Sequence, residues 1–357
     1  MIPDIIIYHY ICIKTIFKFR DMNRSVTVSN MTLSICVLLM SAILVGCEET
    51  ENPMKFPLGT FPDTVINLAA INSNYDDYNS DLYEINDNIQ LIYSSNRKSS
   101  GAQFDLEQAL LSFKFNQTTG EFGLTATMSN NAFTDKLIKK AQTSGNDFGP
   151  YSLYSSLDGY EYFLISSVNV QGNLDLYYLK NRPVYGSNLP DVLGPYPVNL
   201  MNTGSDDAYF CFDANLDSAY FGSNKDGNFD IYLQKRPVDK EIDLWFNMAY
   251  IPSSRPDSIN SPEQDKCPFI LKKNMVFASD RPGGFGGFDL YLSVFRNGKW
   301  NTPVNLGSDI NTSFDEYRPI LGFHQEFTNN YLIFSSNRPG GKGGYDLYFT
   351  GIELTGK

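Results

Sequence analysis

Acidic residues recur along the chain, each ahead of a short apolar segment. The set is Asp76, Asp77, Asp147, Asp206, Asp207, Asp265, Asp315 and Glu316. Paired carboxylates can serve as general acid and general base on a glycosidic bond, and the candidates for that chemistry are Asp77, Asp207, Asp315 and Glu316. Such a ring of acids can also bind a cation or a sugar, or cap turns. Because catalysis needs residues that differ from one another and these acids follow a repeat, the sequence favours turn capping.

A second aspartate recurs directly before an apolar pair, at Asp105, Asp175, Asp230, Asp289 and Asp346. Several of these residues follow a turn rich in glycine, so we expect the carboxylates to accept backbone N–H groups from those turns. The stretch 226–230 (DGNFD) is rich in oxygen atoms, but calcium loops gather more carboxylates around one ion. A structural role is therefore predicted, with no metal and no other cofactor.

Other kinds of chemistry find little support in the sequence. His324 is the only histidine after Cys47, so a site with several histidine ligands to one metal is excluded there. The G-x-S-x-G elbow of serine hydrolases and the phosphate-binding glycine fingerprints are absent. The formal net charge of −12 would repel a polyanion, so nucleic acid is not an expected partner.

The elements that carry these acids belong to a repeat. Five segments align on the second aspartate, and its successive intervals are 70, 55, 59 and 57 residues. The last segment reads IFSSNR at 333–338 and YDLY at 345–348. A second motif precedes it at 305–316 (NLGSDINTSFDE) and recurs at 67–77 (NLAAINSNYDD). Repeats of this length with several short strands are typical of propeller blades.

The string from Trp300 to Tyr348 contains W-x-x-P-x-N-L-G, I-N-T, D-E and F-S-S-x-R-P-G-G-x-G-G-x-D-L-Y. It resembles the WD40-like (PD40) repeats of TolB-type β-propellers found in bacterial envelope proteins. The resemblance covers about residues 64–354 and is weakest in the second repeat, where Val168-Asn169 replaces the Asn-Arg pair. It implies an all-β propeller over 64–354.

Alternation and turn residues place the strands within one repeat. In the last repeat we expect an inner strand at 318–323, a second strand at 331–336, a third at 344–350, and an outer strand supplied by 64–69. Five four-stranded blades result, with the N-terminal strand closing the last blade. The segment 132–143 (AFTDKLIKKAQT) has apolar residues at helical spacing and predicts a short helix between the first two blades.

The first 63 residues differ in composition from the repeats. Residues 22–46 combine a basic start with the apolar run LSICVLLMSAILVG, which is typical of a signal peptide. The end of this run, Leu44-Val45-Gly46-Cys47, resembles a bacterial lipobox, which implies lipidation of Cys47 and a membrane anchor there. Residues 1–21 are interpreted as a mis-called upstream extension, and 47–63 as the lipidated cysteine with an acidic tether. The expected location is the outer membrane, facing the periplasm or the cell surface.

These observations predict a lipid-anchored, non-catalytic propeller that binds an envelope protein or polysaccharide. Aromatic residues expected in rim loops are the candidate contacts: Tyr75, Tyr78, Phe148, Tyr151 and Phe314. The alternative is a glycan-active enzyme, a hydrolase or a lyase, that uses carboxylates at the mouth of the central channel. Cys211 and Cys267 are expected to be buried free thiols, although pairing between them stays open.

Overall fold

The computed structural model describes residues 54–85, 88–183 and 189–354. The predicted signal peptide and Cys47 lie outside these residues. Within them, no helix combines the length and the apolar character that crossing a bilayer requires.

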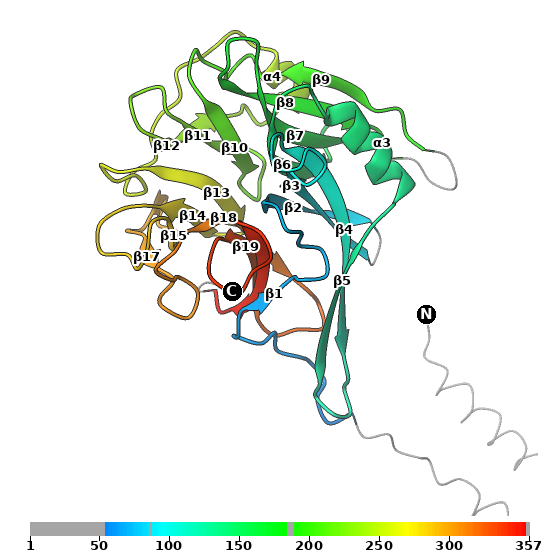
Figure 1. The fold of residues 1–357 in the computed structure, drawn as a ribbon. Coiled ribbons are helices and arrows are strands. Elements are labelled where there is room, and N and C mark those ends of the chain that lie inside the picture. Colours follow the sequence, from blue (N-terminus) through cyan, green and yellow to red (C-terminus); the bar gives the residue numbers. More distant parts are fainter. Residues whose placement is uncertain (1–53, 86–87, 184–188, 355–357) are drawn as a thin grey trace, which may run out of the picture. The chain divides into compact units, whose positions relative to one another are not determined.

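Strands dominate the described chain, and they form five sheets (Figure 1). The first sheet contains β2 (Asp77–Ile85), β3 (Asn88–Ser95), β4 (Asp105–Phe115) and β5 (Phe122–Met128). The second contains β6 (Asp147–Ser155), β7 (Tyr160–Val168), β8 (Leu174–Asn181) and β9 (Leu193–Pro197). The third contains β10 (Asp207–Phe212), β11 (Ser218–Ser223) and β12 (Asp230–Lys235). The fourth contains β13 (Asp265–Leu271), β14 (Asn274–Ser279), β15 (Asp289–Arg296), β16 (Lys299–Trp300) and β17 (Val304–Asn305). The fifth contains β18 (Glu316–Phe323), β19 (Asn330–Ser336), β20 (Asp346–Ile352) and β1 (Ile66–Asn67).

The five sheets close into a propeller. The first strand of each sheet packs against the first strand of the next, and β18 packs back against β2. β1 pairs antiparallel with β20, with Ile66 opposite Phe349 and Asn67 opposite Tyr348. The outer strand of the last blade thus comes from the other end of the propeller, which pairs an edge that would otherwise be open. The predicted fold, an all-β propeller of five blades, is confirmed.

Two segments interrupt the strand repeat. Helix α3 (Ala132–Ala141) forms where the sequence predicts it, and the Asn131 side chain caps its first turn. The third blade departs from the expected four strands, because a loop and helix α4 (Ile242–Phe246) follow its third strand. Trp245 and Phe246 of α4 are buried in the core, so helical side chains supply the apolar cover here.

Every inner strand contains a bulge at its third residue. In all five inner strands the pairing register with the second strand of the blade shifts between the second and the fifth residue. The residue at the bulge has a positive φ in each case: Asn79, Gly149, Tyr209, Cys267 and Arg318. A bulge bends the strand and changes the direction of the side chains that follow it.

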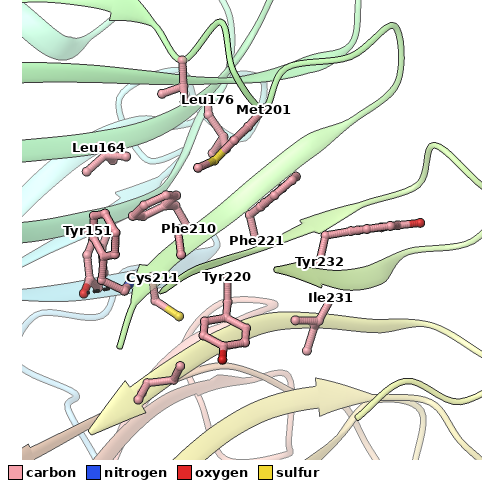
Figure 2. Packing of buried hydrophobic residues seen from close by; sticks show 14 of the residues in the cluster. Tyr151, Leu164, Leu176, Met201, Phe210, Cys211, Tyr220, Phe221, Ile231 and Tyr232 are labelled. Atoms are coloured by element: carbon pink, nitrogen blue, oxygen red, sulfur yellow. Dashed lines mark hydrogen bonds between the residues drawn. The ribbon is translucent and has the colours of Figure 1, made fainter. Parts of the chain in front are cut away.

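The core lies between the blades. Figure 2 shows part of the largest cluster, in which Phe210 and Cys211 of β10 pack between Tyr151 of β6 and Tyr220 of β11. Cys211 and Cys267 are both buried and free. Their positions in the repeat differ, since Cys267 occupies the bulge of β13 and Cys211 lies beyond the bulge of β10. The two cysteines therefore act as small apolar side chains.

Candidate functional site

The beginnings of the inner strands surround a pocket of about 330 Å³, which we call the channel-mouth pocket. Strands β2, β10, β13 and β18 contribute to its wall, together with the residue that precedes the third strand of three blades. The lining residues are Asp76, Tyr78, Phe104, Tyr209, Lys266, Phe288, Asp315, Tyr317 and Tyr345. Its size suits one sugar ring or a molecule of similar volume.

Two carboxylates line this pocket, Asp76 and Asp315, and both contact Tyr345. Oδ1 of Asp76 accepts the backbone N–H of Tyr345 at 2.8 Å, and Oδ2 of Asp315 accepts its hydroxyl at 2.9 Å. Oδ1 of Asp315 also accepts the backbone N–H of Phe288 at 2.9 Å. Each carboxylate thus joins its blade to a neighbour and keeps a fixed orientation at the pocket wall.

The rest of the wall is mostly aromatic. Tyr78 stacks on Tyr345 with ring centroids 5.6 Å apart, and Phe104 meets the edge of Tyr78 at 4.9 Å. On the other side Phe288 meets Tyr317 at 5.4 Å. Burial raises the pKa of the Tyr345 hydroxyl, and the neighbouring Asp315 carboxylate raises it further, so this hydroxyl stays protonated as a donor.

Lys266 is the one cation that lines the pocket. Its Nζ lies 4.6 Å from the ring centroids of both Phe229 and Phe288. No ion pair involves it among the described residues. Burial lowers the pKa of its ammonium group, while nearby carboxylates, including Asp315, partly offset that shift. The pocket therefore combines acids, an amine and hydroxyl donors around one small volume.

The other predicted catalytic acids do not line this pocket. Asp77, Asp207 and Glu316 are fully buried and are not among its lining residues. Arg97 forms an ion pair with Asp77 at 2.5 Å, and Arg338 forms one with Glu316 at 3.0 Å. A backbone N–H four residues earlier also donates to each acid, at 2.5, 2.6 and 2.7 Å. These contacts recur from blade to blade, as expected of acids that cap turns.

The aspartate at the start of each third strand does not line the pocket either. Asp289 accepts the backbone N–H of Phe285 and Gly286 at 2.6 and 3.2 Å. Asp346 accepts those of Lys342 and Gly343 at 2.7 and 3.1 Å. Asp105, Asp175 and Asp230 occupy the same register position opposite the last serine of the second strand.

Of the aromatic residues expected at the rim, Tyr75 and Phe314 are exposed and Tyr78 and Phe148 are partly buried. The expectation for Tyr151 was wrong, because its ring lies in the core and its hydroxyl accepts the backbone N–H of Phe212 at 3.1 Å. The physical reason is the bulge of β6, which turns Tyr151 toward the neighbouring blade. Tyr209, Lys266, Tyr317 and Tyr345 were not singled out from sequence, since they vary between repeats.

Two buried polar side chains lie on the inner strands below the pocket. Asp81 of β2 is 2% exposed and Arg318 of β18 is fully buried. Burial raises the pKa of Asp81 to about 7, although the neighbouring Ser152 and the charge of Arg318 lower it. The side chains between the two ends of the inner strands are buried, so the channel-mouth pocket ends inside the propeller. A second, apolar pocket of about 400 Å³ lies at the far ends of these strands.

One further group of acids comes together outside the channel. Asp158, Glu241 and Asp243 each place a carboxylate oxygen within 4.8 Å of the others. Oxygen ligands of this kind suit a hard cation. However, the Tyr162 hydroxyl donates to Asp158 at 2.6 Å, and Lys180 pairs with Asp243. The lysine thus already neutralises part of this cluster.

No family model matches this chain, and no curated protein does. Solved structures do match. An endo-arabinase from Bacteroides thetaiotaomicron aligns with a TM-score of 0.50 and 12% identity, over 82% of this chain and 98% of that one. RS223-β-xylosidase aligns with a TM-score of 0.49 and 8% identity, over 82% and 95%. At 12% identity the likeness to the endo-arabinase shows a shared fold.

These comparisons correct the function expected from sequence. The solved propeller that aligns with a TM-score of 0.50 is named as an endo-arabinase and not as a TolB-type propeller. The non-catalytic scaffold expected from sequence is therefore contradicted and is not proposed again. The prediction of a non-catalytic role rested on the repetition of the acids. Asp315 occupies a repeated position and yet also lines the pocket.

Proposed function

We propose that this propeller is a glycan-active enzyme and that the channel-mouth pocket holds the sugar. The observation that carries the proposal is the meeting of two oriented carboxylates, Asp76 and Asp315, with aromatic faces in one sugar-sized pocket. Ring faces carry partial negative charge and attract the C–H edges of a sugar, and carboxylates accept its hydroxyl groups. The names of the matching solved propellers agree with this class of substrate.

Hydrolysis of a glycosidic bond needs one group that activates water and one that protonates the leaving oxygen. Asp315 is suited to the first role, because it lines the pocket and its Oδ1 is anchored by the backbone N–H of Phe288. Lys266 is suited to the second, because it lines the same pocket and burial lowers the pKa of its ammonium group, which makes that group a stronger acid. Asp76 then binds sugar hydroxyls opposite them.

Asp315→Asn is expected to lower kcat/KM by about 10²–10⁴-fold, the usual contribution of a general acid or base. Asparagine keeps an oxygen that can accept the N–H of Phe288, so this contact between the fourth and fifth blades should persist. The measurement is release of reducing sugar from arabinan, xylan, galactan and mannan. Asp206→Asn is the matched control, because Asp206 makes the same contact with Leu174 at 2.8 Å without lining the pocket. Equal losses in both variants, or no activity on any glycan, would contradict the proposal.

We infer in addition that the chain is a lipoprotein of the outer membrane. What supports this is the sequence around Leu44 to Cys47, which lies outside the described residues. Cells that express the full chain should incorporate labelled palmitate, and Cys47→Ala should abolish the label because the acylated thiol is lost. Cys211→Ala serves as the control, since Cys211 is buried in the core and should not be acylated. Label retained in Cys47→Ala would refute the inference.

We also infer that the repeats are of PD40 type, as the string from Trp300 to Tyr348 indicates. A profile made from the five repeats of this chain should then recover TolB-type propellers ahead of other propeller classes. Recovery of glycoside hydrolases first would count against this ancestry. The inference concerns descent and leaves the proposed chemistry unchanged.

A further inference from the structure

The end of the propeller opposite the channel-mouth pocket, which we call the base, carries exposed apolar side chains. The inner strands begin at the pocket and finish at the base. The exposed apolar residues there come from three parts of the chain, and we call them the basal apolar surface: Met54, Phe56, Leu58, Tyr154, Leu157 and Phe323. Tyr154 and Phe323 also line the apolar pocket of about 400 Å³, so the apolar surface continues into that pocket.

The segment 54–58 is held at the base by contacts with two turns. The N–H of Phe56 donates to the backbone oxygen of Gln117 at 2.9 Å, in the turn between β4 and β5 (Figure 1). The Phe56 ring lies against Gly120 of the same turn. The N–H of Gly59 donates to the backbone oxygen of Glu326 at 2.7 Å, in the turn between β18 and β19. The described chain therefore begins at the base of the propeller.

The distance along the chain to Cys47 limits how far the base can lie from a bilayer. This step rests on the lipid anchor proposed above for Cys47. Met54 follows Cys47 by seven residues, which span about 25 Å at most when fully extended. The eight residues of β18 span about 26 Å from the channel mouth to the base. An anchored chain thus keeps its base near the bilayer, and its channel mouth lies about one strand length farther away.

The charges at the base do not favour one sign. Lys55 and Lys272 are exposed there, and Nζ of Lys272 lies 5.7 Å from the ring centroid of Phe323. Glu121 and Glu326 are exposed at the same end. Apolar contact is therefore the attraction that this surface offers to a lipid, since aromatic and aliphatic side chains enter the boundary between headgroups and acyl chains.

We propose that the basal apolar surface docks on the phospholipid leaflet that holds the lipid of Cys47. Phe323, Tyr154 and the side chains of 54–58 enter the leaflet, and the channel-mouth pocket faces away from it. That orientation leaves the pocket open to a glycan outside the bilayer. The docking does not depend on the chemistry proposed for Asp315, so failure of the glycan activity leaves it standing.

The test is quenching of tryptophan fluorescence by brominated phosphatidylcholine, with the full lipidated chain reconstituted in vesicles. Phe323→Trp should lose about half of its added emission when ordinary lipid is replaced by lipid brominated high in the acyl chains, because docked side chains lie about 5–10 Å deep in this region. Wild-type protein supplies the blank, since both of its tryptophans are buried.

Phe285→Trp is the matched control. Phe285 is 49% exposed and Phe323 is 55% exposed, so tryptophan replaces a surface aromatic residue in both variants and both should fold. Phe285 lies in the turn between β14 and β15, at the channel-mouth end, and its added emission should not change with brominated lipid. Equal quenching in the two variants, or none in either, would overturn the docking while the anchor stands.

A longer tether separates docking from mere proximity. A Gly/Ser linker inserted after Asn52 allows the propeller to move away from the bilayer while it stays anchored. Quenching of Phe323→Trp should persist in this longer chain, and its loss would show that the base is only held nearby. Flotation of the vesicles and the palmitate label report the anchor itself. Their absence would overturn the anchor and the docking together.

Discussion

Replacing Phe61 by alanine is expected to lower the free energy of unfolding by about 3–5 kcal/mol, the usual cost of removing a fully buried aromatic side chain. Phe61 is 1% exposed and stacks on Phe327 with ring centroids 3.8 Å apart. Phe113 and Phe122 of the first blade and Tyr331 and Phe349 of the last also contact its ring. The loss would therefore leave a cavity between the two blades that close the propeller.

The backbone around Phe61 strengthens this expectation. Its N–H donates to Oδ1 of Asn329 at 2.8 Å, and its carbonyl accepts from Nδ2 of the same residue at 3.0 Å. Gly351 donates to the carbonyl of Pro62 at 2.6 Å. These contacts hold the segment in place, so neighbouring side chains have little freedom to fill the cavity.

Urea denaturation followed by tryptophan fluorescence measures the effect of Phe61→Ala as a lower midpoint at unchanged m-value. Phe56→Ala is the matched control, because Phe56 belongs to the same segment and is 43% exposed. A loss in Phe61→Ala as small as that of Phe56→Ala would show that the segment does not close the propeller.

Much of the fold follows from residues that repeat. The aspartate before each third strand and the upstream Asn-Leu motif recur because every blade needs the same turns. The outer-strand sequence at 65–68, with no strands before it in the repeat, predicts the pairing of β1 with β20. The burial of Phe61 was not predicted, because this residue falls within 47–63, which composition assigns to a tether. Its partner Phe327 lies far away along the chain.

The site is harder to predict, since it depends on residues that do not repeat. The bulge position is asparagine, glycine, tyrosine, cysteine and arginine in turn, so no common residue type marks it. Asp76 and Asp77 are neighbours in sequence, yet Asp76 lines the pocket and Asp77 is buried in an ion pair. Successive residues of a strand point to opposite faces, and sequence alone does not say which face meets the pocket. Asp315 and Glu316 show the same division.

Asp81 should make the protein less stable as pH rises from about 4 to about 7. Its pKa is raised from 3.8 to about 7 in the folded chain, chiefly by burial, and returns to its ordinary value on unfolding. Between these values the folded state binds more protons than the unfolded state, so the free energy of unfolding falls with pH. The shift corresponds to a total loss on the order of 4 kcal/mol, reached above pH 7.

Asp81→Asn should remove this dependence, because asparagine does not titrate and keeps nearly the same shape. The variant is thus expected to be more stable than the wild type at pH 8, with a smaller difference at pH 5. Urea denaturation across this range measures the difference. Asp309→Asn is the control, since Asp309 is exposed and should leave the pH profile of the wild type unchanged. A profile in Asp81→Asn that falls as steeply as that of the wild type would assign the pH dependence to other groups, and the axis would then hold an ionised Asp81 beside Arg318.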